Sequence, residues 1–383
     1  MRVAVVTWDG GSNRQPFESL CRELIDRGDA VHVLSHEAHR GLYEGLGARF
    51  DALPVGDKAL GFRPSALGER ERVMKVWLSP EVADAVVAML SARRFDIAIV
   101  DASLLTAFAA CEAAAMPFIV VHHSLPGAAW SGPRREQYEA FVGPVNEVRQ
   151  ALDLPTVAGF GDLMSRAASH IVPTAALLDS PVSWDLPLHY VGPLQPDRFD
   201  VNIPELPPRF VLVSMSTTWQ RQVDVLQGTI DALASLERAV VVTTGPSVDP
   251  SELSPAANTV VFAELQHRQI LDRVDVVVTH AGHGTVISAL TAGVPLVCVP
   301  MGRDQHDVSR RVAAIGAGIE LDPTTISHAL TPAVKRAFGE PEFATRAKDI
   351  ARAIAEHGGI LEALAVIDRC VQARAPRRAE KEP

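Results

Sequence analysis

Residues 274–305 read VDVVVTHAGHGTVISALTAGVPLVCVPMGRDQ, and this stretch decides how the chain folds. Its apolar, β-branched run at 276–279 predicts a buried parallel strand, and a glycine-rich turn then leads into apolar residues at helical spacing. Gly293 suits the left-handed end of that helix, Pro295 bars its continuation, and residues 296–299 predict a second buried strand. The stretch therefore predicts a βαβ unit, the building block of a doubly wound α/β sheet.

Polar groups follow both strands of this unit, at the sheet edge where such folds bind ligands. A helix that starts in a glycine-rich turn presents unpaired N–H groups and the positive end of its dipole, which suits a phosphate group. After the second strand, Asp304 and Gln305 supply a carboxylate and an amide that can bind sugar hydroxyls. A phosphate site beside a hydroxyl site predicts a nucleotide sugar as the ligand.

The pattern T-H-x-G-x-G-T-x-x-x-A-L-x-x-G-V-P-L-x-x-x-P-x-x-x-D-Q resembles the donor-binding signature of family 1 glycosyltransferases. It is most similar to the bacterial branch that decorates antibiotics and other natural products. The resemblance implies the GT-B architecture, an α/β fold in which two Rossmann-like domains with doubly wound parallel sheets face one another across a cleft. The residues that the resemblance and the turn chemistry assign to the donor are Ser216, Thr217, His267, His280, Gly282, Gly284, Thr285, Asp304 and Gln305.

The resemblance also implies an inverting enzyme that moves a sugar from a dTDP- or UDP-sugar to a small natural-product acceptor. No D-x-D triplet is present, and Asp304 and Asp307 are separated by two other residues, so the sequence predicts no metal and no cofactor. The helix start and His280 are expected to balance the diphosphate charge instead. An aromatic residue that often stacks on the base in this family is missing before His267, so the nucleobase stays open between uracil and thymine.

The length of 383 residues is too great for one ordinary core and suits two domains of roughly 200 residues each. We expect an acceptor-binding domain at 1–200 and a donor-binding domain at 201–358, separated by the proline-rich stretch 194–209. A helix at 359–375 is expected to pack back on the first domain, as in the family. Residues 376–383 are expected to form a disordered tail.

The periodicity of the sequence gives the main elements. Two segments, 53–72 and 125–159, are less regular and only partly helical, and we expect them to recognise the acceptor. Strands are predicted at 3–7, 31–34, 97–100, 118–121, 210–214 and 240–244, and helices at 17–27, 104–115, 221–236, 344–357 and 360–373.

A net charge of −10 with interspersed basic and acidic residues argues against nucleic acid or a membrane surface as a partner. The longest apolar stretch, 97–121, contains Asp101, Glu112 and Pro117 and predicts strand, helix and strand rather than a membrane span. The chain starts directly with a strand, without a signal-peptide core. We expect a cytoplasmic monomer or homodimer. Four scattered cysteines are expected to be buried and free: Cys21, Cys111, Cys298 and Cys370.

The general base is where the sequence departs from the family. There, a His, or an Asp in some antibiotic enzymes, stands a few residues before a proline that follows the first strand, and this side chain deprotonates the acceptor. Here residues 9–16 read DGGSNRQP, and Asn13 takes that position, although a carboxamide has no useful basicity. Asp9 is the nearest titratable alternative.

Asp101 matches the family aspartate that normally orients the catalytic histidine. We expect Asp101 to act directly or to relay a proton through His122 or His123, which end the neighbouring strand at the same edge. An unusually acidic acceptor or a loss of transfer activity would also account for the missing base. Two alternative functions therefore stay open, a nucleotide-sugar epimerase or hydrolase of similar fold and a non-catalytic partner that binds nucleotide sugars.

Overall fold

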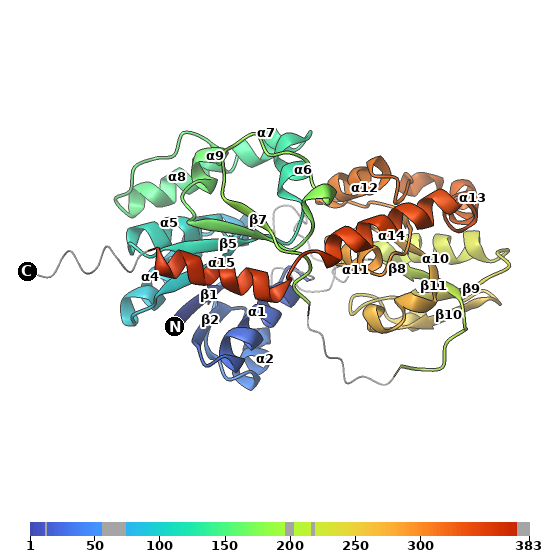
Figure 1. Cartoon of the computed structure of the whole chain (residues 1–383), viewed down its shortest axis with the longest axis horizontal. Coiled ribbons are helices and arrows are strands. Elements are labelled where there is room, and N and C mark those ends of the chain that lie inside the picture. Colours follow the sequence, from blue (N-terminus) through green and yellow to red (C-terminus); the bar gives the residue numbers. More distant parts are fainter. Residues whose placement is uncertain (12–13, 56–73, 196–202, 216–218, 374–383) are drawn as a thin grey trace, which may run out of the picture.

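The computed structural model describes residues 1–11, 14–55, 74–195, 203–215 and 219–373. Two sheets form two lobes that lie side by side, the first built from the N-terminal half and the second from the rest of the chain (Figure 1). All paired strands in both sheets run parallel. The fold predicted from the sequence, GT-B with two parallel-sheet Rossmann-like lobes, is confirmed. Within the described residues, no helix is long and apolar enough to cross a membrane.

The first sheet has seven strands in the order β3-β2-β1-β4-β5-β6-β7. Its central strands are apolar and buried on both faces, because helices cover the two sides of a parallel sheet. The strands are β1 (Arg2–Val6), β2 (Ala30–Ser35), β3 (Arg49–Ala52), β4 (Ile97–Asp101), β5 (Phe118–Val121), β6 (Ser169–Val172) and β7 (Leu188–Tyr190).

The second sheet has six strands in the order β10-β9-β8-β11-β12-β13. The order reverses next to β8, which is the point where doubly wound sheets leave room for a ligand. The strands are β8 (Phe210–Ser214), β9 (Ala239–Thr243), β10 (Thr259–Phe262), β11 (Val274–Thr279), β12 (Leu296–Cys298) and β13 (Gly318–Glu320).

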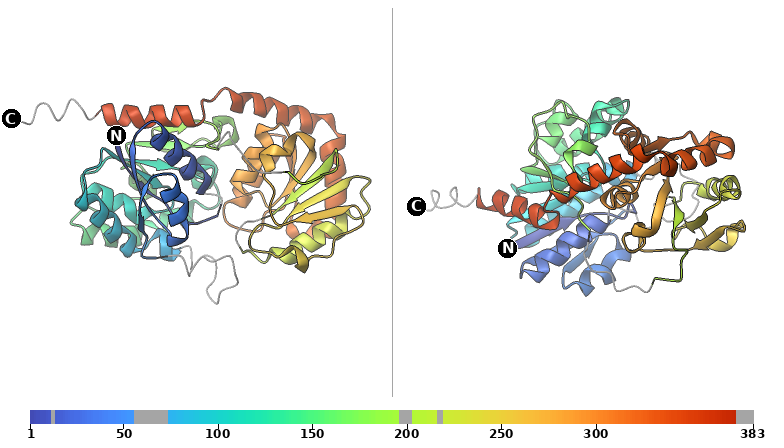
Figure 2. Two further views of the ribbon diagram at one scale, coloured as in Figure 1. Left: turned by 90° about the horizontal axis from the view of Figure 1, so that it is seen from below. Right: turned by 45° about the vertical axis from the view of Figure 1, so that its right-hand side comes forward.

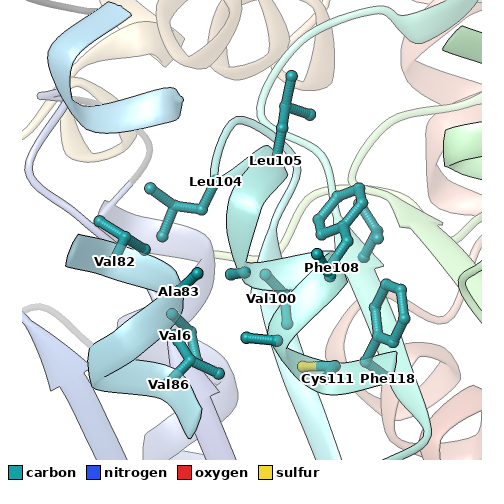
Figure 3. Packing of buried hydrophobic residues seen from close by; sticks show 14 of the residues in the cluster. Val6, Val82, Ala83, Val86, Val100, Leu104, Leu105, Phe108, Cys111 and Phe118 are labelled. Carbon is teal, nitrogen blue, oxygen red and sulfur yellow. The ribbon is translucent and has the colours of Figure 1, made fainter. Parts of the chain in front are cut away.

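Helices of the first lobe cover its sheet with apolar faces. Figure 3 shows Val82 and Val86 of α4 (Pro80–Ala92) and Phe108 of α5 (Leu105–Ala113) packed near Val6 and Val100 of the central strands. The segment 125–159, expected to be less regular and partly helical, contains three short helices joined by irregular stretches, in agreement with that prediction. The remaining helices are α1 (Arg14–Asp26), α2 (Arg40–Gly45), α6 (Pro126–Ser131), α7 (Arg135–Glu139), α8 (Val142–Ala151) and α9 (Phe160–Met164).

The last helix, α15 (Ile360–Gln372), crosses from the second lobe to the first (Figures 1 and 2). Its Val366 and Ile367 are buried in the same cluster as Val3 of β1. An ion pair of 2.9 Å between Arg27 and Asp368 adds a contact at the surface. The helices of the second lobe are α10 (Gln222–Leu233), α11 (His283–Thr291), α12 (Gln305–Ala314), α13 (Ile326–Gly339) and α14 (Pro341–Ala355).

Candidate active site

Strand register brings the chemically important residues to the carboxyl edges of the two sheets. In the second sheet, Thr279 at the end of β11 pairs with Ser214 of β8 and Cys298 of β12. The turns that follow these strands therefore start next to one another at the carboxyl edge of the second sheet. In the first sheet, Asp101 at the end of β4 pairs with Val121 of β5, so the residues after them share an edge as well.

The turn after β11 is shaped for a ligand at the start of α11. Gly282 is the residue that precedes the helix, and no side chain caps the first N–H groups. A Cβ at Gly282 would lie 2.5 Å from Nε2 of His280, so the ring of His280 packs directly on the glycine. Ala281 adopts a φ of +65°, a conformation that costs a non-glycine residue energy and is common at ligand sites. Gly284 and Thr285 follow in the first helical turn.

His280 is buried behind this turn. Its Nδ1 lies 3.3 Å from the hydroxyl of Thr279, and the backbone of Ser214 also contacts the ring. Burial lowers its pKa to about 4, so the imidazole is neutral at pH 7. A neutral ring of this kind donates one hydrogen bond and accepts another.

His267 begins the short 3-10 helix η4 (His267–Gln269), which packs against α11. Its Nε2 is 3.5 Å from the hydroxyl of Thr243, and burial lowers its pKa to about 4. Ser216 and Thr217 lie outside the described residues. The structure thus places His267 near the predicted donor site and does not describe the hydroxyl-bearing turn.

Asp304 ends the loop between β12 and α12, and Gln305 is the first residue of α12. A carboxylate oxygen of Asp304 accepts a hydrogen bond from the hydroxyl of Ser124, which belongs to the other lobe. Gln305 is buried, its carbonyl oxygen accepts the N–H groups of Met301 and Gly302, and its amide donates to Gln220 at 3.0 Å. Because of these three hydrogen bonds, the main structural role of Gln305 is to hold the loop. One hydrogen of its amide group is left for a ligand.

Asp101 lies at the centre of the first lobe's edge and is fully buried. One carboxylate oxygen accepts the N–H of Ser103 at 2.9 Å, and the Ser103 hydroxyl donates to the same oxygen. The indole N–H of Trp8 in turn donates to that hydroxyl. The same carboxylate oxygen is 3.5 Å from Nδ1 of His123, which makes His123 the histidine that pairs with Asp101.

His122 faces a different partner. Its Nε2 lies 3.1 Å from Nδ1 of His170, whose own Nε2 donates to the carbonyl of Met164. The carbonyl can only accept, so in the neutral rings His122 is the donor to His170. Burial holds the pKa of His122 well below its usual range. These contacts make His122 a packed, neutral histidine, whose ring also lies against Trp130.

Two pockets meet at His123. The first, which we call the cleft pocket, lies between the lobes, and its lining includes Gln15, Pro16, His123, Gln195, His283 and Gly284. The second, which we call the aromatic pocket, has a lining that includes His123, Trp77, Trp130, Tyr138, Phe141 and Phe160. His123 lies between a space at the start of α11 and a space suited to an apolar molecule.

His283 is a site residue that the sequence did not single out. It is the first residue of α11 and lines the cleft pocket, with only 7% of its surface exposed. Its Nε2 is buried and has no hydrogen-bond partner among the described residues. Burial lowers its pKa to about 4, although the charge of Asp304 opposes that shift. The signal in the sequence was a histidine between the two glycines of the turn.

A second carboxylate and histidine pair lies at the neighbouring strand ends. Asp9 is 3.3 Å from Nε2 of His39, and Nδ1 of His39 is 3.2 Å from the hydroxyl of Ser35. Burial alone would raise the pKa of Asp9, but the hydrogen bond and charge of His39, together with the Gly11 N–H, lower it. Neither Asp9 nor His39 lines either of the two pockets. Asn13 lies outside the described residues.

Direct contacts join the two lobes around these pockets. Besides the bond between Ser124 and Asp304, Arg134 pairs with the buried Asp307 at 3.3 Å. The amide of Gln195 donates to the hydroxyl of Ser288 on α11 at 3.0 Å. The lobes therefore touch on both sides of the cleft pocket, and groups from both can reach one ligand.

The chain is similar to known glycosyltransferases. Residues 227–362 match the family described as erythromycin biosynthesis protein CIII-like, C-terminal domain. The O-mycaminosyltylonolide 6-deoxyallosyltransferase of Streptomyces fradiae is 24% identical, with 98% of each chain covered. The solved glycotransferase of kitacinnamycin has a TM-score of 0.79 at 21% identity, covering 96% of this chain and 98% of that one. Glycosyltransferase VinC, solved in complex with DTDP, has a TM-score of 0.72 at 19% identity, covering 97% and 100%.

The fold and these matches define a GT-B glycosyltransferase. The matched C-terminal domain, the curated relatives and the solved structures all indicate a family 1 glycosyltransferase of the antibiotic-biosynthesis branch, in agreement with the family and the enzyme class predicted from the sequence.

Proposed function

We propose that this enzyme transfers a sugar from a nucleoside diphosphate sugar at the start of α11 to a hydroxyl of a small molecule in the aromatic pocket. One observation carries the proposal. His123 borders both the aromatic pocket and the cleft pocket, and its Nδ1 faces the carboxylate of Asp101 at 3.5 Å. A base for the acceptor must lie where the two substrates meet, and His123 does.

The donor binds with its diphosphate at the first turn of α11. There the uncapped N–H groups and the helix dipole favour an anion, and His280 adds a neutral hydrogen-bond donor. The uncapped turn and the relative solved with DTDP support a nucleoside diphosphate as the ligand. Asp304 binds hydroxyls of the sugar from the loop beside the turn. We propose that the helix start replaces a metal ion, so that EDTA leaves transfer intact.

Transfer is a single displacement. The acceptor oxygen attacks the anomeric carbon of the sugar while the bond from that carbon to the diphosphate oxygen breaks. His123 takes the hydroxyl proton through Nε2, and the nucleoside diphosphate leaves with the bonding electron pair. Because the oxygen attacks the face opposite the leaving group, the anomeric configuration inverts. Asp101 acts as a positioning residue that holds the ring and stabilises the positive charge it gains.

The test is an assay of nucleoside diphosphate release from UDP-glucose and dTDP-glucose, with and without a hydroxylated acceptor. The proposal predicts release that depends on the acceptor, with a glycoside of inverted configuration as product. Equal release without an acceptor would identify a hydrolase. Donor binding without release against any acceptor would identify a non-catalytic nucleotide-sugar-binding protein.

A further inference from the structure

The walls of the aromatic pocket form one continuous chain of rings. Trp77 meets Phe141 edge to face at 6.1 Å, and Phe141 meets Tyr138 at 5.6 Å. Tyr138 continues to Phe160 at 5.2 Å, and Phe160 to Trp130 at 5.8 Å. Aromatic residues make up only 5% of the chain, so five of them around one pocket are a marked concentration. Neighbouring rings are steeply inclined, so the wall can offer a guest both faces and edges.

The polar groups of the pocket follow the ends of β4 and β5. Ser103 is occupied by Asp101 and Trp8, and the hydroxyl of Ser124 is bound to Asp304. His123 lies after β5 as well. The pocket therefore combines an aromatic lining with polar groups, one of which, His123, also lines the cleft pocket.

We infer that the acceptor is a neutral, planar aromatic molecule, of one or more fused rings, which presents a hydroxyl to His123. This inference rests on the proposed function and names its substrate class. Five aromatic side chains line the pocket, and small-molecule sites are typically lined by apolar and aromatic side chains with a few polar groups. The pocket-lining residues that the structure describes include no aspartate, glutamate, lysine or arginine, so a charged group on the body of the acceptor would lose its hydration without a partner.

Tyr138 supplies a second point of recognition. Its ring lines the pocket, and its hydroxyl makes no hydrogen bond to any residue in the described part of the chain. Burial raises the pKa of Tyr138 to about 12, so the hydroxyl stays protonated near neutral pH. It can therefore bind a second oxygen on the aromatic body of the acceptor.

Calorimetry with matched probes tests the inference independently of transfer. In the presence of UDP or dTDP, 2-naphthol should bind about tenfold more tightly than decahydro-2-naphthol, which keeps the hydroxyl and the skeleton but lacks the aromatic faces. The charged probe 6-hydroxy-2-naphthoate should bind more weakly than 2-naphthol. Equal affinity for the planar and saturated probes, or preference for the charged one, would overturn the inference.

Two variants locate the binding. Phe141→Leu should lower the affinity for 2-naphthol by about three- to tenfold and leave the affinity for the nucleotide unchanged. Phe343→Leu in α14, which is the same change outside the pocket, should alter neither affinity. Because the Tyr138 hydroxyl is proposed to bind a second oxygen, 2,6-dihydroxynaphthalene should bind more tightly than 2-naphthol. Tyr138→Phe, a milder change, should remove this difference in affinity. Unchanged 2-naphthol affinity in Phe141→Leu would place the acceptor elsewhere. If 2-naphthol binds as expected but receives no sugar, the proposed transfer fails while the inferred acceptor class stands.

Discussion

His280 is held in place by a contact that leaves little freedom. Its Nε2 packs on the bare Cα of Gly282, and its Nδ1 lies beside Thr279, so the ring is fixed behind the first turn of α11. Its burial keeps it neutral at pH 7, which suits a hydrogen bond to a diphosphate without an ionic charge of its own. In the proposed function, His280 binds the leaving group and does not move a proton.

His280→Ala should therefore weaken binding of UDP or dTDP. A hydrogen bond to a charged group contributes about 1.5–3 kcal/mol, or roughly ten- to a hundredfold in affinity. Calorimetry measures the change, and His328→Ala, an exposed histidine of α13, is the matched control. Equal nucleotide affinity in wild type and His280→Ala would remove His280 from the donor site.

Asp304→Ala should impair use of the sugar nucleotide far more than binding of the bare nucleoside diphosphate, because the proposed partners of this carboxylate are sugar hydroxyls. Ser124→Ala removes its hydrogen-bond partner from the other lobe but keeps the carboxylate, and serves as the control. Kinetics with the sugar nucleotide and calorimetry with the nucleoside diphosphate separate the two effects. An equal loss for both ligands would place Asp304 at the diphosphate instead.

Sequence patterns predicted the positions of the proposed donor residues more easily than they distinguished between the proposed catalytic ones. His280 and Asp304 stand at fixed offsets from strands, so their edge of the sheet could be predicted. His283 was missed because its burial depends on how the two lobes pack. The choice between His122 and His123 depended on side-chain direction, which no spacing rule supplies. The roles of Asn13, Ser216 and Thr217 stay predictions.

At the scale of elements, the backbone around the donor site departs from relaxed conformations. Ala281 has a φ of +65°, and Arg303, directly before Asp304, has a φ of +54°. Each such residue costs on the order of 1–3 kcal/mol unless its surroundings hold it. Strain in both donor loops fits a site whose ligand groups are fixed before the substrate arrives.

Gly282→Ala tests this turn directly. The added Cβ would lie 2.5 Å from Nε2 of His280, so the ring must move away from the helix start, and nucleotide affinity should fall by about tenfold or more. Gly302→Ala, in the other donor loop, meets no atom within 4 Å and should change affinity by less than about twofold. Circular dichroism should show both variants folded. An affinity of Gly282→Ala close to that of wild type would refute the proposed geometry.

Apolar strands were predictable, including the three-residue β12, whereas several short or partly polar strands were not. The predicted strands at 118–121 and 210–214 agree with β5 and β8 residue for residue. Strands β7 and β13 have three residues each, and a run that short carries no recognisable alternation. Their strand geometry comes from pairing with β6 and β12, which is a tertiary effect. The predicted segment 53–72 lies mostly outside the described residues.

At the scale of the whole molecule, α15 and the loops around the cleft connect the lobes. Val366 of α15 is buried with Val3 of β1, so the C-terminal helix belongs to the core of the first lobe. The pair of Arg134 and Asp307 joins the lobes next to the donor loop. The βα rhythm predicted two sheets, but the contacts across the cleft depend on long-range packing that a single sequence does not encode locally.

Stability should fall as the pH drops from 7 to 5. In this window the buried histidines stay neutral in the folded protein, whereas the same histidines are protonated in the unfolded chain, where their pKa is near 6.5. The unfolded state therefore binds more protons, which lowers its free energy relative to the folded state. The loss should exceed about 3 kcal/mol, since one pKa unit corresponds to about 1.4 kcal/mol. Burial lowers the pKa of His32, His122, His170, His189, His267, His280 and His283.

Urea unfolding at pH 7, 6 and 5 measures this effect, and the window lies above the range where most carboxylates titrate. A free energy of unfolding that stays constant from pH 7 to 5 would show that the buried histidines accept protons without cost, contrary to their surroundings in the structure.

The most direct test of the central claim is the pH dependence of the single-turnover transfer rate in wild type, His123→Gln and Asp101→Asn, at saturating donor and acceptor. If His123 takes the acceptor proton, His123→Gln should lower the rate by on the order of 10²–10⁴ and abolish the acidic limb of the profile, with donor affinity unchanged. Asp101→Asn should lower the rate and shift that limb to lower pH, because the carboxylate no longer stabilises the protonated ring. A rate and pH profile in His123→Gln equal to those of wild type would contradict the account.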